Sequence, residues 1–109
     1  MKRGALQTNL PDASNSEIIE TISEMHGNKV RIERIVSEGQ STPPGFWYDQ
    51  PWDEWVIIMK GGAELEFDSP ATKETLREGD WILIPAHRRH RVRSTLPATL
   101  WLAVHGDTE

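Results

Sequence analysis

Hydrophobic and polar residues alternate along most of the chain with a period of two, which is typical of β-strands. Residues 29–37, KVRIERIVS, alternate and are rich in β-branched side chains, so they predict a strand. Further strands are predicted over 53–60, 63–67, 81–85, 90–94 and 99–105, separated by turns rich in Gly, Pro and Asp. Short strands at this spacing predict an all-β antiparallel sandwich or small barrel.

The N-terminal part of the chain follows a different pattern. Residues 1–16 are polar and predict a loosely attached arm. Ser14 and Glu17 have the spacing of a capping box, and isoleucines recur at helical spacing from Ile18 to Met25. We therefore expect an arm and a short helix over 1–28, the helix covering 16–25, followed by the barrel over 29–109.

The strand predicted over 53–60 is apolar on both faces. Val56 and Ile58 lie on one face with Glu54, while Trp55, Ile57 and Met59 lie on the other. An antiparallel sheet with one solvated face would alternate polar and apolar residues. The second face is therefore expected to be covered, either by the N-terminal helix or by a second copy of the chain, and we favour a homodimer.

Composition narrows the class of protein. A chain of 109 residues forms one domain with a substantial core. It has no cysteine, which excludes disulfides and zinc–thiolate sites and favours a reducing, cytoplasmic location. The net charge of −5 argues against nucleic-acid binding. No apolar run has the length of a membrane span, and no secretory signal is evident, so we expect no membrane partner.

Two glycine frames carry a family resemblance. Glu54 is followed by six residues and Gly61, while Gly79 is followed by DWILI, Pro85 and His90. In these frames the chain resembles the cupins, whose motifs run G-x5-H-x-H-x3-E-x6-G and G-x5-P-x-G-x2-H-x3-N. The resemblance covers about residues 30–105. The strings RIERIVSEGQ, GFWYDQ, DEWV and PAHRRHRV are similar to a subgroup of small single-domain cupins, mostly of unknown function. The resemblance implies a double-stranded β-helix, the jelly-roll barrel.

The resemblance also implies a metal site, with departures. The two histidines of the first cupin motif align with Tyr48 and Gln50, and the glycine of the second motif aligns with His87. Of the four usual ligands, Glu54 and His90 remain. The candidate metal ligands are Gln50, Glu54, His87 and His90. Such a mixed nitrogen and oxygen set suits zinc, manganese, iron or nickel.

The segment from Gly45 to Trp55, GFWYDQPWDEW, combines aromatic and acidic residues. Tyr48 and Gln50 are two apart and would share a face, and Pro51 permits a bend that returns Glu54 to the same interior. An aromatic-walled cavity with a few convergent polar groups is typical of a small-ligand site. We expect five side chains to meet at the barrel mouth, rimmed by Trp47 or Trp52: Tyr48, Gln50, Glu54, His87 and His90.

The same residues allow catalysis without metal. Tyr48, Glu54 and His90 could act as general acid and base on a carbohydrate or keto acid. Alternatives stay open for each: Glu54 at a frayed strand end, His90 as a hydrogen-bonded core residue, and His87 as a turn residue. His105, on the last predicted strand, is expected to be structural.

The segment His87–Arg93 contains four arginines. They could form a basic lip that attracts an anionic substrate. Alternatively, Arg91 and Arg93 pair with Glu64 and Glu66 on a neighbouring strand, which we favour. Two functions remain open: a small metal-dependent cupin enzyme, a dioxygenase or isomerase, or a non-catalytic, metal-free cupin module that binds a small organic ligand.

Overall fold

The computed structural model describes residues 1–106, and all regular secondary structure in that range is β-strand. The strands are β1 (Ile18–Met25), β2 (Val30–Ser37), β3 (Asp53–Lys60), β4 (Gly62–Phe67), β5 (Thr72–Arg77), β6 (Trp81–Ile84), β7 (His90–Thr95) and β8 (Thr99–Gly106). This range contains no helix with the length and apolarity needed to span a bilayer.

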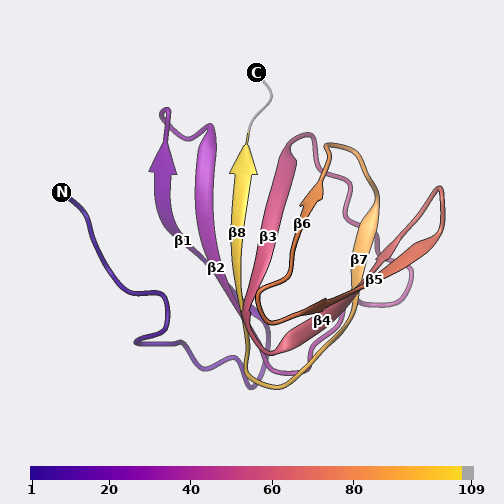
Figure 1. Ribbon diagram of the computed structural model, residues 1–109, viewed down its shortest axis with the longest axis horizontal. Helices are drawn as coiled ribbons and strands as arrows, with labels where there is room; N and C mark the ends of the chain where they lie inside the picture. Colours follow the sequence, from indigo (N-terminus) through magenta and orange to yellow (C-terminus); the bar gives the residue numbers. More distant parts are fainter. Residues whose placement is uncertain (107–109) are drawn as a thin grey trace.

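The strands form two antiparallel sheets that face each other (Figure 1). One sheet has five strands in the order β1-β2-β8-β3-β6, and the other has three in the order β5-β4-β7. The core lies between them, with Val56, Ile58 and Ala103 from the larger sheet packed against Leu65 and Phe67 from the smaller. The predicted all-β antiparallel fold is confirmed.

The predicted helix over 16–25 is wrong, because this segment forms β1. It pairs antiparallel with β2, from Ile18 opposite Val36 to Met25 opposite Val30. The β-branched residues of the segment favour a strand wherever a sheet edge is available. The helical spacing of its isoleucines is accommodated by an irregularity in the register between Thr21 and Ser23.

Arg34 of β2 anchors the N-terminal arm. Its guanidinium donates hydrogen bonds of 3.0–3.4 Å to three main-chain carbonyl oxygens of the arm, those of Leu6, Thr8 and Asn9. Its Nε donates to Glu20 at 2.9 Å. The Arg34 side chain is buried, so these bonds are partly shielded from water. One arginine therefore fixes the arm on the outer face of the larger sheet.

The arm covers part of that outer face. Ala13 is 2% exposed and packs with Val36 and Leu100, and Met59 of β3 contacts the same cluster. The expected burial of Met59 is thus provided by the arm itself rather than by a helix.

The opposite end of the outer face is apolar and open. Trp55 and Ile57 of β3 are half-buried and lie opposite Leu83 and Trp81 of β6. Trp81 is 60% exposed and Leu83 is 54% exposed. The rings of Trp55 and Trp81 lie 6.0 Å apart. This outer patch, defined as Trp55, Ile57, Trp81 and Leu83, is where the expected second copy would bind, and the dimer stays a prediction.

Gly61 forms the tight turn between β3 and β4. Its φ is +87°, a left-handed conformation that glycine adopts readily. A Cβ atom added there would lie 2.8 Å from the Cα of Thr99. Both the backbone conformation and the close approach of β8 therefore require glycine at the position that the cupin motif reserves for it.

Candidate functional site

A cavity of about 100 Å³ opens between the two sheets. Apolar side chains from both sheets, among them Leu65 and Trp101, form most of its wall. Seven side chains with polar groups also line it: Glu17, Glu33, Tyr48, Gln50, Glu54, His90 and His105. A mostly apolar cavity with a few convergent polar groups has the character of a small-ligand site.

The segment between β2 and β3 runs alongside β7 and carries two of these side chains to the cavity. Tyr48 and His90 exchange both main-chain hydrogen bonds, at 2.7 and 3.1 Å. Thr42 accepts a hydrogen bond from the Val92 amide at its Oγ1, at 2.9 Å. Further along, the His87 amide donates to the Gln50 carbonyl at 2.7 Å. The segment thus acts as an irregular extra strand beside the smaller sheet.

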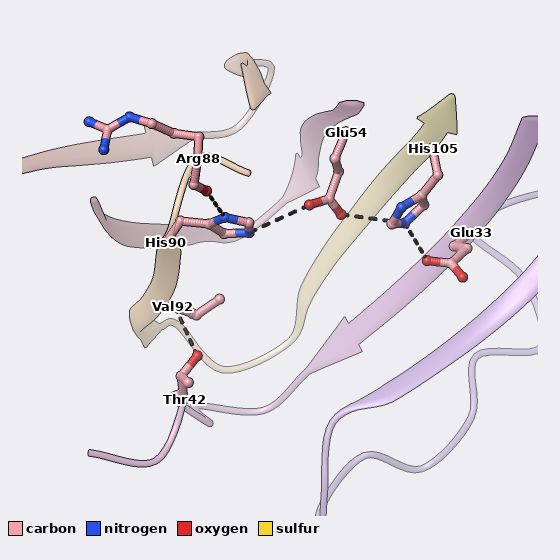
Figure 2. A network of polar contacts seen from close by, with 7 residues as sticks. All are labelled: Glu33, Thr42, Glu54, Arg88, His90, Val92 and His105. Atoms are coloured by element: carbon pink, nitrogen blue, oxygen red, sulfur yellow. Dashed lines mark hydrogen bonds and ion pairs between the residues drawn. The ribbon is translucent and has the colours of Figure 1, made fainter. Parts of the chain in front are cut away.

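Two carboxylates and two imidazoles alternate across the cavity (Figure 2). Glu33 Oε1 lies 2.8 Å from His105 Nε2, which in turn lies 3.4 Å from Glu54 Oε2. The other oxygen of Glu54 lies 3.6 Å from His90 Nε2. Glu54 on β3, His105 on β8 and His90 on β7 are all at least 90% buried. Buried ionisable groups persist in such a place only when they are paired, as these are.

The protonation of His90 follows from its second contact. Its Nδ1 lies 2.9 Å from the carbonyl oxygen of Arg88, which can only accept a hydrogen bond. Nδ1 therefore carries a proton, and Nε2 of the neutral ring holds the free lone pair. That lone pair faces a carboxylate oxygen of Glu54, so the gap between them suits a proton or a donor group of a ligand.

Sequence reasoning missed His105 as a site residue and assigned it a structural role. The structure places it on the cavity wall, between Glu33 and Glu54. The two-residue period of the strand indicates that His105 faces the interior, because Trp101, Ala103 and His105 share the inner face of β8. The missing information was the register that sets His105 opposite Glu54.

Glu17 was also missed, because it precedes β1 in a segment expected to lie outside the barrel. Its carboxylate lines the cavity and accepts a hydrogen bond of 2.9 Å from Ser37. Burial raises the pKa of Glu17 above its ordinary value, and the hydrogen bond from Ser37 opposes the change. The segment expected to form the N-terminal helix therefore contributes an acidic group to the cavity.

Tyr48 lies between acidic neighbours and an imidazole. Its ring stacks on that of His90, with centroids 5.6 Å apart. Burial raises the pKa of the Tyr48 phenol above its usual range, and the negative charges of Glu17 and Glu54 raise it further. The phenol is therefore held in its protonated form at neutral pH and can act as a hydrogen-bond or proton donor.

The structure does not bring His87 to the cavity. Its side chain is 69% exposed, and its Nδ1 lies 2.8 Å from Asp49 at the surface. Its φ of +62° belongs to a left-handed turn after Pro85, which aims the side chain outward. The other four predicted residues, Tyr48, Gln50, Glu54 and His90, do line one cavity, and their chemical roles remain predictions.

The expected tryptophan rim is also placed differently. Trp47 lines a separate surface hollow beside Phe67 and Lys73. Trp52 contacts the ring of His105 edge-on, with centroids 5.6 Å apart, and the guanidinium of Arg31 lies over the Trp52 ring. Neither tryptophan is part of the cavity wall.

The arginines between His87 and Arg93 bind to the smaller sheet and its loops. Arg91 pairs with Glu66 at 3.2 Å, and Arg93 pairs with Glu64 at 3.0 Å, as favoured from the sequence. Arg89 pairs with Asp68 at 3.0 Å. Arg88 donates to the carbonyl oxygens of Asp68 and Pro70. None of the four lines the cavity, so the basic lip does not form there.

The donor set fits a metal ion poorly. With His87 turned outward, the candidates reduce to Gln50, Glu54 and His90. Within residues 1–106, no three His, Cys, Asp or Glu side chains are placed to hold one metal ion. His105 could add a nitrogen only through Nδ1, because its Nε2 is already hydrogen-bonded to Glu33. The glutamates and histidines of the cavity wall pair with one another and do not converge on one point as metal ligands would.

Among residues 1–106, three buried polar atoms near the cavity have no hydrogen-bond partner within that range: Gln50 Oε1, His105 Nδ1 and Trp52 Nε1. Buried polar groups in folded proteins are nearly always hydrogen-bonded. Gln50 Oε1 accepts, and Trp52 Nε1 donates. The unpaired atoms on Gln50 and His105, which line the cavity, indicate that it is built to receive a ligand with hydrogen-bonding groups.

Comparison with known proteins agrees with this architecture. A family model described as a cupin domain matches residues 33–105. The structure resembles that of a Ralstonia eutropha JMP134 protein provisionally described as a mannose-6-phosphate isomerase, with a TM-score of 0.90 and 44% identity. That match covers 99% of this chain and 100% of the other. No curated protein matches the chain.

More distant matches concern the fold alone. A cupin superfamily protein of Desulfitobacterium hafniense DCB-2 has a TM-score of 0.77 and 18% identity, over 98% of this chain and 93% of the other. An RmlC-like cupin of Desulfovibrio desulfuricans has a TM-score of 0.75 and 16% identity, over 96% of each chain. The expected jelly-roll barrel is thereby confirmed.

Proposed function

Because the chain belongs to the cupin family, we propose that it is an isomerase that moves a proton between adjacent carbons of a small hydroxycarbonyl compound. His90 is the general base, Tyr48 the general acid, and Glu54 the group that orients and stabilises the charged form of His90. No metal ion takes part in the proposed reaction.

The observation that carries this proposal is the contact between Glu54 Oε1 and His90 Nε2, 3.6 Å apart on the cavity wall. The Arg88 carbonyl holds a proton on Nδ1 and leaves Nε2 as the basic nitrogen. The Glu54 carboxylate thus lies beside the nitrogen that would take up the proton in general-base catalysis. The other carboxylate oxygen of Glu54 lies beside His105 Nε2, which is itself paired with Glu33.

The reaction balances with these groups alone. His90 Nε2 removes the proton from the carbon that bears the hydroxyl, and the C–H electron pair becomes the C=C bond of an enediol. Tyr48 donates its proton to the carbonyl oxygen at the same time. In the second half, the imidazolium returns its proton to the neighbouring carbon. The Tyr48 phenolate recovers a proton from the other hydroxyl, whose oxygen becomes the new carbonyl.

A metal-dependent dioxygenase or isomerase, expected from the sequence, has less support. The outward position of His87 and the pairing of His105 with Glu33 leave a weak donor set. A non-catalytic binding module would need the cavity but not the alternation of acids and bases. The Ralstonia eutropha relative is also described as an isomerase, and sugar isomerisation is a proton transfer of the proposed kind.

The test is solvent-deuterium incorporation into carbon-bound positions of a panel of small hydroxyaldehydes and hydroxyketones, followed by NMR. Protein treated with a chelator and shown to be free of transition metal should retain full exchange. Tyr48→Phe should lower the rate while the variant keeps its fold and ligand affinity. Exchange that disappears on chelation and returns with added metal would overturn the metal-free mechanism.

We also propose that a second copy of the chain covers the outer patch. The arm, residues 1–17, is already fixed elsewhere on that face by Arg34 and by the packing of Ala13. The patch is free of charged side chains and consists of residues that are depleted on ordinary surfaces. A two-fold contact would bury it against itself. A cytoplasmic location stays a prediction.

A further inference from the structure

We infer that the cavity selects an uncharged ligand and rejects phosphorylated ones, so that the substrate is a small neutral hydroxycarbonyl compound. This inference rests on the proposed function for the reaction type, and it names the substrate class. It differs from what the description of the Ralstonia eutropha relative would suggest, since a sugar phosphate is dianionic.

The charges of the cavity wall carry the inference. Three carboxyl groups line it, those of Glu17, Glu33 and Glu54. No lysine or arginine from residues 1–106 lines it. A phosphate group in proteins is held by arginine or lysine side chains or by clustered main-chain amides. Like charges at contact distance in a partly dehydrated site repel strongly, so an anionic ligand would bind weakly.

The arginines nearest the cavity in sequence and register contact groups outside the cavity. Those of the loop before β7 and of β7 itself pair with acidic residues and carbonyls of the smaller sheet and its loops, as described above. Arg31 of β2 lies opposite His105 in the register, and its guanidinium stacks on Trp52 at 4.9 Å from the ring centroid. The phosphate of a ligand that protrudes from the cavity could contact Arg31. A variant at Arg31 therefore tests the inference.

Size points in the same direction. The cavity volume of about 100 Å³ is smaller than the roughly 150 Å³ cavity that admits benzene. A three-carbon hydroxyketone therefore suits the part of the cavity that lies between the two sheets. The unpaired Gln50 Oε1 would accept a hydrogen bond from a ligand hydroxyl, while His90 and Tyr48 address the carbon and the carbonyl oxygen.

The experiment compares dihydroxyacetone with dihydroxyacetone phosphate, two ligands that differ by the phosphate. Binding is followed by the NMR shifts of the imidazole protons of His90 and His105, which report occupancy of the cavity without requiring turnover. Deuterium exchange is measured on the same samples. We expect dihydroxyacetone to bind at millimolar concentration and its phosphate to bind about tenfold more weakly or worse.

Variants make the charge argument specific. Glu17→Gln should raise the affinity for the phosphate relative to the affinity for dihydroxyacetone, because it removes a negative charge from the wall. Glu24→Gln, on the exposed face of β1, is the matched control and should alter neither affinity. Arg31→Gln should leave both unchanged.

Each outcome has a defined meaning. Tighter binding of the phosphate, especially if Arg31→Gln abolishes it, would overturn the inference while leaving the proton-transfer mechanism intact. Binding of dihydroxyacetone without any deuterium exchange would overturn the proposed function but keep the neutral-ligand selectivity. Failure of both compounds to shift either imidazole would overturn the assignment of this substrate class.

Discussion

Glu54 and His105 lie opposite each other in the pairing of β3 with β8, and Glu54 Oε2 is 3.4 Å from His105 Nε2. Each residue comes from a central strand of the larger sheet. The geometry of the carboxylate is therefore set by the sheet register rather than by a loop. A site supported in this way is held in a fixed arrangement, which general acid–base chemistry requires.

Arg34→Lys should release the N-terminal arm. Lysine cannot reproduce the hydrogen bonds that the guanidinium donates to three carbonyls and Glu20, and the acceptors would be left unpaired. We expect a loss of about 2 kcal/mol in the free energy of unfolding and faster cleavage within residues 1–17 in limited proteolysis. Arg93→Lys, at an exposed pair with Glu64, should change stability by less than about 1 kcal/mol. Equal effects of the two variants would contradict the anchoring role.

Gly61→Ala should destabilise the barrel more than Gly39→Ala. Both glycines have a φ of +87°, so both variants acquire left-handed strain of about 1 kcal/mol. At Gly61 the new Cβ also meets the Thr99 backbone at 2.8 Å, whereas no atom of residues 1–106 would lie within 4 Å of a Cβ at Gly39. Denaturant unfolding should show an extra loss of about 2 kcal/mol for Gly61→Ala. Equal losses of unfolding free energy in the two variants would contradict the close approach of Thr99 to Gly61.

Glu17→Gln should change the pH dependence of stability. Because the folded-state pKa of Glu17 is raised, the unfolded chain releases this proton first as pH rises. The stability contributed by the protonated group is therefore complete below the ordinary glutamate pKa and is lost as pH rises through the raised folded value. The variant should gain stability relative to wild type across this window.

Denaturant midpoints measured at a series of pH values check this expectation, with Glu24→Gln as the exposed control. Wild type and Glu17→Gln should differ in slope only between the ordinary and the raised pKa. Parallel curves throughout that range would show that Glu17 ionises normally in the folded protein.

Leu83→Glu should dissociate the proposed dimer. A charge placed in the outer patch would be buried without a partner in a two-fold contact. Sedimentation velocity should show a dimer for wild type and a monomer for the variant. Leu96→Glu is the matched control, since Leu96 is 57% exposed and Leu83 is 54% exposed. If the wild-type protein sediments as a monomer, the proposed dimer is wrong.

Much of the barrel could be predicted from alternation alone. The strands over 53–60, 63–67 and 99–105 agree with β3, β4 and β8 within a residue. No strand is predicted over residues 72–77, because β5 is mostly exposed and polar and carries no apolar alternation. The helix was mispredicted over β1 because isoleucines at helical spacing also fit an irregular edge strand.

Site residues could be predicted from the sequence where the alternation of a strand decides which side chains face the cavity. Glu54 and His90 follow from their period with Val56 and Val92, and both line the cavity. His105 and Glu17 could not be found this way, because their roles depend on cross-strand register and on a chain segment that folds back. His87 was placed wrongly in the convergent set because a left-handed turn, invisible in the pattern, directs it to the surface.

The central claim is that His90, supported by Glu54, transfers a proton in the cavity without metal. The most direct measurement is deuterium incorporation into dihydroxyacetone by chelator-treated protein, comparing wild type with His90→Gln and with His26→Gln as the exposed control. We predict equal rates for wild type and His26→Gln, and a rate lower by about a hundredfold or more for folded His90→Gln. An undiminished rate in His90→Gln would contradict the claim.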